Sequence, residues 1–190
     1  MTDMILAIVK RGRARDLMKA AREAGAGGGT VNYARGTASS TILAALGIAD
    51  SRREVLRIFA GPDESRKIAG RMEKSGIKGS LAICGKEDGM ENWTLVEVIC
   101  EEGFGEEVMA VARRAGATGG TVVSAHGTST EDDVKFFGSP LVPEKEIVMM
   151  VLENDVASAV VQAVEGLEVL KQKGRAVLFT LPVKHFANLA

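Results

Sequence analysis

The chain has 190 residues, of which 46% are hydrophobic and 26% charged, and its formal net charge at pH 7 is −1. This composition is typical of a globular protein, and because no apolar run approaches the roughly 18 residues of a membrane-spanning helix, we expect a cytoplasmic protein without membrane insertion. Charge is divided unevenly, with 16 basic and 10 acidic side chains in residues 1–90 (+6) and 8 and 15 in residues 91–190 (−7), which favours two domains that attract each other over a nucleic-acid surface.

The first half of the chain predicts strand, helix, strand, strand, helix and strand, in that order. An apolar strand over residues 4–10 precedes a helix over residues 13–25, in which Leu17 and Ala21 recur at helical spacing. Gly25 stands where a glycine commonly ends a helix. The remaining elements are a strand that begins at Thr30, a strand over 54–60, a helix over 64–76 and a strand over 80–84.

The second half repeats the first. Residues 22–39 read REAGAGGGTVNYARGTAS and residues 113–130 read RRAGATGGTVVSAHGTST, so 11 of the 18 positions are identical at an offset of 91. A match of this length indicates that one module was duplicated. The second copy predicts strands over 94–100, from Thr121, over 146–152 and over 176–182, and helices over 105–116 and 155–167.

The order βαββαβ is that of the ferredoxin-like plan. We therefore predict an α+β fold of two tandem ferredoxin-like domains, residues 1–87 and 92–190, each with an antiparallel sheet and its helices on one face. The other face of each sheet would need cover from a neighbour. The residues expected to supply that apolar back face are Val31, Leu56 and Ile58 in the first copy and Val122, Val148 and Met150 in the second.

The second strand of each copy ends in a similar tripeptide, Arg35-Gly36-Thr37 or His126-Gly127-Thr128. A glycine between cationic and hydroxyl side chains can present backbone N–H groups to an anion. A hinge where the strand leaves the sheet accounts for the same pattern equally well.

The connections that follow, residues 38–53 and 129–144, are long for two antiparallel strands. The second of them carries Phe136 and Phe137, which are candidate partner contacts if exposed. The same two side chains would be structural if they packed back onto the domain.

The segments AGATGGTVVSAHG (115–127) and EIVMMVLENDVASAVVQAV (146–164) resemble the PII nitrogen-regulatory family, where they lead into the T-loop and form the third strand and second helix. The resemblance covers residues 94–182 and, more weakly, residues 4–84. It implies a trimeric ring that binds adenine nucleotides (ATP, ADP or AMP), and in many members 2-oxoglutarate, in clefts between subunits. It also implies that the T-loop grips a transporter, an enzyme or a transcription factor.

The resemblance also implies where a ligand would bind. Arg175, after Gly174, falls where the family has a phosphate-binding lysine, whereas the first copy has Ser80 there. The ligand-binding candidates are Thr121, Gly127, Thr128, Ser129, Gly174 and Arg175 in the second copy and Thr30, Gly36 and Thr37 in the first.

From these patterns we expect a PII-like signal-transduction protein, linked to nitrogen or related metabolism, that senses an adenine nucleotide between domains and is a homo-oligomer. No catalytic residues or resident metal are expected. Three alternatives stay open: a partner-binding scaffold without a ligand site, a CutA-like metal-tolerance protein that uses His126 or the cysteines Cys84 and Cys100, and an acylphosphatase-like enzyme.

Overall fold

The computed structural model describes residues 2–38, 50–85, 92–126, 135–136, 139–140, 144–171 and 175–189. The first half contains β1 (Asp3–Lys10), α1 (Ala14–Glu23), β2 (Thr30–Ala38), β3 (Asp50–Ala60), α3 (Pro62–Glu73) and β4 (Gly79–Cys84). The second half contains β5 (Trp93–Glu101), α4 (Gly105–Arg114), β6 (Gly119–His126), β9 (Glu144–Glu153), α5 (Asn154–Glu165), α6 (Glu168–Lys171) and β10 (Val177–Leu189), with a short ribbon of β7 (Lys135–Phe136) and β8 (Ser139–Pro140) between β6 and β9.

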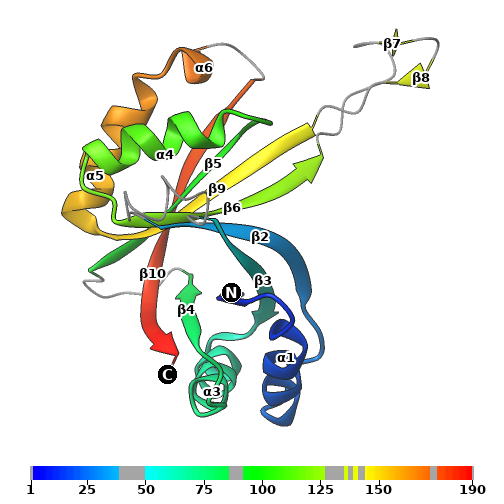
Figure 1. The fold of residues 1–190 in the computed structure, drawn as a ribbon. Coiled ribbons are helices and arrows are strands. Elements are labelled where there is room, and N and C mark those ends of the chain that lie inside the picture. Colours follow the sequence, from blue (N-terminus) through cyan, green and yellow to red (C-terminus); the bar gives the residue numbers. More distant parts are fainter. Residues whose placement is uncertain are drawn as a thin grey trace.

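Eight strands form one closed antiparallel barrel in the order β1-β3-β2-β6-β9-β5-β10-β4, with β4 returning to β1. Strands of the two halves meet at two seams. At the first seam β2 pairs with β6, from Ala34 opposite Val123 to Ala38 opposite Gly119. At the second seam the C-terminal part of β10 pairs with β4. The helices lie outside the barrel, α1 and α3 on one side and α4 and α5 on the other (Figure 1).

The prediction of two tandem ferredoxin-like domains, each with its own sheet, is therefore wrong. The elements of each half follow the predicted order, but the strands at the edges of the two expected sheets pair across the seams. Closure leaves no edge with unpaired backbone groups, and the hydrophobic periodicity of a strand does not report which edge it will pair with. The division at residues 1–87 and 92–190 stays a prediction.

Two hydrophobic clusters lie between the barrel wall and the helices. In the first half Ile5, Leu56 and Ile58 pack under α1 and α3, and in the second half Val122, Val148 and Met150 pack under α4 and α5. Except for Ile5, these strand residues were expected, together with Val31, to form the back face of each sheet. They face the helices instead, and the barrel lumen takes the alternate residues.

A third cluster fills the lumen, where each half covers the back face of the other. On β1, Leu6 points inward while its neighbours Ile5 and Ala7 point toward the helices, as strand alternation requires. The buried members of the lumen cluster are Leu6, Val55, Ala82, Cys84, Leu95, Val123, Met149 and Val183. The apolar back face that was expected to need a neighbouring chain is covered within this chain, and the predicted homo-oligomer stays a prediction.

One ion pair crosses the lumen between the halves. On β3, Arg57 donates from Nη1 to Asn32 Oδ1 at 2.9 Å and from Nη2 to Met149 Sδ at 3.3 Å. Its Nη2 lies 3.8 Å from Oε1 of Glu97 on β5. Burial raises the pKa of Glu97, and Arg57 opposes that shift. The pair therefore joins the two halves at the cost of placing a carboxylate in a largely apolar lumen.

The second seam has its own buried ion pair. The register of β10 shifts between Val183 and His185, and Lys184 at this bulge reaches Asp3 Oδ2 of β1 at 2.8 Å. Ser65 donates a hydrogen bond of 2.6 Å to the same oxygen. Lys184 and Asp3 are 3% and 0% exposed, so this contact ties the C-terminal strand to the first half in a dry environment.

Both cysteines are free and buried, Cys84 in the lumen and Cys100 under α4. Burial, with a contribution from Glu146, raises the pKa of Cys100 to about 11. None of the helices in the described ranges has the length and apolar character needed to cross a bilayer.

The lumen carboxyl of Glu97 predicts a distinctive pH dependence. Because its folded-state pKa is raised, the folded protein holds this proton more tightly than the unfolded chain, so ionisation destabilises the fold as pH rises from the ordinary value of 4.5 through the raised pKa. We expect the free energy of unfolding of wild type, minus that of Glu97→Gln, to fall across this window. Urea unfolding of both proteins between about pH 4 and 8 measures the difference. A difference that is flat or rises with pH would contradict the assignment.

Candidate functional site

A pocket of about 450 Å³ opens at one end of the barrel, near the first seam and the start of β4. We call this end of the barrel the first mouth. By strand alternation, six of the residues that line its pocket face the lumen: Ile8, Gly36, Ser51, Arg53, Ser80 and Thr121. The lining is completed by Thr37, Gly79, Thr118, Gly119 and Gly120. Both halves of the chain therefore contribute to one pocket.

Gly36 shapes the first mouth because its neighbours occupy the space of a side chain. It pairs with Ser51 on one side and Thr121 on the other. A Cβ at this position would lie 2.7 Å from Ser51 Oγ and 3.3 Å from Arg53 Nε. The absence of a side chain lets Arg53 fold over the β2 backbone, where its Nε donates to Ser51 Oγ at 2.9 Å.

The chemistry of the first mouth suits an anion. The lining combines the guanidinium of Arg53 with the hydroxyls of Ser51, Ser80 and Thr121, and no carboxylate lines the pocket in the described part of the chain. A guanidinium offers planar paired donors to phosphate or carboxylate, and hydroxyls add donors that rotate to suit the ligand.

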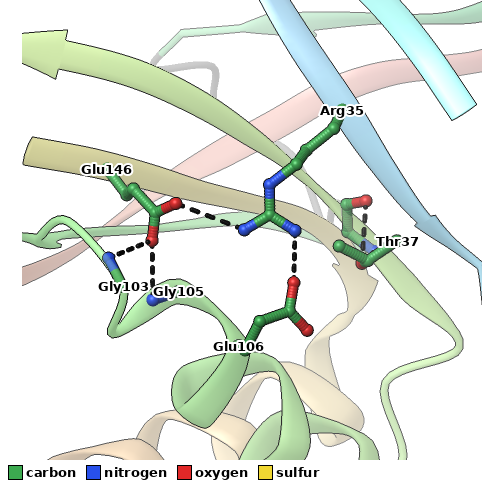
Figure 2. A network of polar contacts seen from close by, with 7 residues as sticks. Arg35, Thr37, Gly103, Gly105, Glu106 and Glu146 are labelled. Atoms are coloured by element: carbon green, nitrogen blue, oxygen red, sulfur yellow. Dashed lines mark hydrogen bonds and ion pairs between the residues drawn. The ribbon is translucent and has the colours of Figure 1, made fainter. Parts of the chain in front are cut away.

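Thr37 closes the seam beside the pocket. Its Oγ1 donates to the carbonyl of Gly120 and accepts from the Gly120 N–H, both at 3.1 Å. Figure 2 shows Thr37 beside the Arg35 network. Thr37 is 4% exposed, so the contact fixes the position of the wall and leaves its hydroxyl engaged.

Arg35 ties the same stretch of β2 to the second half. Its guanidinium forks between Glu106, on the first turn of α4, and Glu146 on β9, 3.2 Å from Glu146 Oε1 (Figure 2). The other carboxylate oxygen of Glu146 accepts the N–H groups of Gly103 and Gly105, at 3.2 and 2.9 Å. The network links the strand beside the pocket to the start of α4.

The duplication reproduces part of this arrangement in the first half. Glu54, the counterpart of Glu146, accepts the N–H of Ala14 at 2.9 Å at the start of α1. Gly12 and Gly103 occupy equivalent turns with φ of 88° and 92°. A carboxylate from the third strand of each half thus satisfies an otherwise unpaired N–H at the start of a helix.

The structure brings together three of the predicted ligand-binding residues, Gly36, Thr37 and Thr121, at the first mouth. Arg175 lies elsewhere: its Nε and Nη2 donate to Glu101 Oε2 at 3.0 and 2.5 Å. Thr30 begins β2 opposite Arg57, at the far end of that strand from Thr37. The candidates Gly127, Thr128, Ser129, Gly174 and Phe137 lie outside the described residues, and Phe136 is described as part of β7 in its backbone alone.

Sequence reasoning missed Arg53, Ser51 and the pocket role of Ser80. The first two were assigned to an irregular connection over 38–53, whereas β3 begins at Asp50. Their counterparts in the repeat, including Lys145 for Arg53, were the available signal, because two cations at equivalent positions in both copies stand out in an alignment of the halves.

A metal site of the CutA-like kind has no support in the described ranges, where no three His, Cys, Asp or Glu side chains gather. His126 pairs with Glu144 through Nδ1 at 2.9 Å, and the two cysteines lie in different hydrophobic clusters.

Removing the helix-capping carboxylates is expected to destabilise the protein unequally. Glu146→Ala strands two N–H groups and removes one of the two carboxylates that contact Arg35, so we expect a loss of about 2–4 kcal/mol in the free energy of unfolding. Glu54→Ala strands the Ala14 N–H and should cost about 1–3 kcal/mol. The exposed neighbour Glu144→Ala is the control, within about 0.5 kcal/mol of wild type. Equal losses for Glu146→Ala and Glu144→Ala in urea unfolding would refute the assigned network.

Comparison with known proteins identifies no family. No family model matches the chain, and no curated protein matches it. Among solved structures, the chain aligns with a microcompartments protein from Desulfitobacterium hafniense DCB at 11% identity, covering 97% of this chain and 96% of that chain with a TM-score of 0.30. It aligns with a mutant chlorite dismutase from Candidatus Nitrospira defluvii at 10% identity, covering 97% and 92% with a TM-score of 0.25. Alignments at these scores carry no argument about function.

Proposed function

We propose that this chain is a cytosolic regulatory protein that binds a small anionic ligand at the first mouth, with adenine nucleotides as the first candidates. The observation that carries the proposal is the pocket itself, in which Arg53 and several hydroxyls surround about 450 Å³ without a carboxylate among the described lining residues. A volume of this size is in the range of pockets that hold small molecules.

The regulatory part of the proposal rests on where the pocket lies. Its lining comes from β2, β3 and β4 of the first half and from the start of β6 in the second. A ligand that contacts both halves binds better when the first seam is closed, so occupancy changes the population of the closed form. Partner proteins that recognise that form would respond to the ligand.

The resemblance to the PII family supplies the identity of the candidate ligands. Three residues that the resemblance assigns to a nucleotide cleft, Gly36, Thr37 and Thr121, line this pocket. A sensor is preferred to an enzyme because the lining offers donors for an anion but no paired general base and nucleophile within the described residues. A link to nitrogen metabolism and a ring-like oligomer remain part of the proposal through the same resemblance.

Calorimetric titration of the full chain with ATP, ADP, AMP and 2-oxoglutarate tests the proposal. We expect at least one of them to bind and to raise the melting temperature by mass action. Arg53→Ala should weaken binding about ten- to a hundredfold, because a charge-assisted hydrogen bond contributes roughly 1.5–3 kcal/mol.

The matched control is Arg22→Ala, which removes an exposed arginine from the last turn of α1 without touching the pocket. Its affinity should equal that of wild type. Absence of heat and of a thermal shift with all four compounds at millimolar concentration would remove the proposal, as would an Arg53→Ala variant that binds like wild type.

A further inference from the structure

The duplication gives the barrel a second mouth that is equivalent to the first. At the first mouth Lys10 lies directly opposite Arg53 on the β1·β3 ladder. At the second mouth Glu101 lies directly opposite Lys145 on the β5·β9 ladder. Offsets of 91 and 92 residues make Glu101 the counterpart of Lys10 and Lys145 the counterpart of Arg53. The two mouths therefore differ by a reversal of charge at one strand end.

The second mouth supplies a carboxylate partner for its own arginine, Arg175. Glu101 accepts two hydrogen bonds from Arg175, and Lys145 Nζ donates to the Arg175 carbonyl at 3.4 Å. The Arg175 contact holds the pKa of Glu101 below its usual range, so this carboxylate is charged at neutral pH. An incoming anion would have to displace Glu101 from Arg175, which weakens any site there.

The first mouth carries two like charges with no internal counter-ion. Lys10 and Arg53 are direct cross-strand neighbours, an arrangement that is destabilising when the charges are equal in sign. In the part of the chain that the structure describes, neither is paired with a carboxylate, and the hydrogen bond that Arg53 makes there is to the neutral hydroxyl of Ser51. Lys10 follows the pocket residue Ile8 by two positions on β1, so the two side chains lie on the same face of the strand.

Cβ atoms of directly opposite residues lie about 4.5–5.5 Å apart, so both side chains can reach a single multiply charged group. Such a group relieves the repulsion between them and gains two charge-assisted contacts. A singly charged carboxylate gains less, since it neutralises one of the two cations.

We propose that the first mouth binds an anionic group of two or more charges between Lys10 and Arg53, one per chain, and that the second mouth binds none. This inference rests on the proposed function and adds to it a ligand residue, Lys10, a charge requirement and a stoichiometry. Phosphate groups and dicarboxylates both have the required charge.

Titration calorimetry of the full chain with pyrophosphate, 2-oxoglutarate and acetate distinguishes these sources. We expect one equivalent of pyrophosphate or of 2-oxoglutarate per chain, and no competition by acetate at equal ionic strength. Tighter binding of pyrophosphate identifies the ligand group as a phosphate, and tighter binding of 2-oxoglutarate identifies it as a dicarboxylate. Binding of acetate with equal affinity would overturn the charge requirement.

Two matched variants locate the site. Lys10→Glu installs the residue that the duplicate carries at Glu101 and should weaken binding at least about tenfold, whereas Lys10→Arg keeps the charge and should stay within about threefold of wild type. Lys145→Glu makes the same charge change at the second mouth and should leave the affinity unchanged. Retained melting temperature and circular dichroism establish that each variant is folded.

The outcomes separate the two proposals. If anions bind but Lys145→Glu weakens them as much as Lys10→Glu, or if two equivalents bind per chain, the inference fails while the binding function stands. If Lys10→Glu binds like wild type while Arg53→Ala does not, Lys10 is excluded as a ligand residue. If neither these anions nor the nucleotides bind, both proposals fall.

Discussion

Pairing of strands across the two seams is the constraint on which the rest of the structure depends. Each half presents an apolar sheet face that must leave water, and the barrel buries both faces against each other. The first seam demands close backbone approach at Gly119, where a Cβ would lie 2.9 Å from the Thr37 carbonyl. Gly119 also lines the first mouth, so pairing across the first seam shapes the pocket as well.

The sequence predicted the local elements well because their causes are local. The helical spacing of Leu17 and Ala21 places α1, and Gly25 and Gly116 adopt φ of 102° and 109° after their helices, as expected of glycines that end a helix. Which side of each strand faces the helices and which faces the lumen could not be predicted in the same way. Strands that are buried on both faces read as continuous apolar runs, so Leu56 and Ile58 carried no mark of whether they face helix or lumen.

Several residues of the candidate site could be predicted one by one from the sequence, but which of them lie together in one pocket could not. Gly36, Thr37 and Thr121 were selected from their own copies, and pairing across the first seam then brought the two copies together, which a comparison within one module cannot foresee. The resemblance assigned Arg175 to the same site as Thr121 because Arg175 falls where the PII family has a phosphate-binding lysine. Pairing along β5 and β10 places it beside Glu101 instead. Non-local strand pairing decides such groupings, and it leaves little trace in local sequence.

The basic first half and the acidic second half contact each other through ion pairs in the lumen and at the first seam. Leu6 lies opposite Arg57 on the β1·β3 ladder, and Glu97 lies opposite Met149 on the β5·β9 ladder. At the offsets of the repeat, Glu97 is the counterpart of Leu6 and Met149 is the counterpart of Arg57. Two first halves packed together would bring two copies of Arg57 into one lumen without Glu97, and two second halves would bury two copies of Glu97 without Arg57. Unpaired buried charge is strongly unfavourable, so the Arg57–Glu97 pair favours the association of unlike halves over like ones. The Arg35 contacts with Glu106 and Glu146 act in the same direction at the first seam. Divergence of the duplicate thus favours the pairing of unlike halves, and it left the first mouth with Lys10 in the place where the second mouth has Glu101.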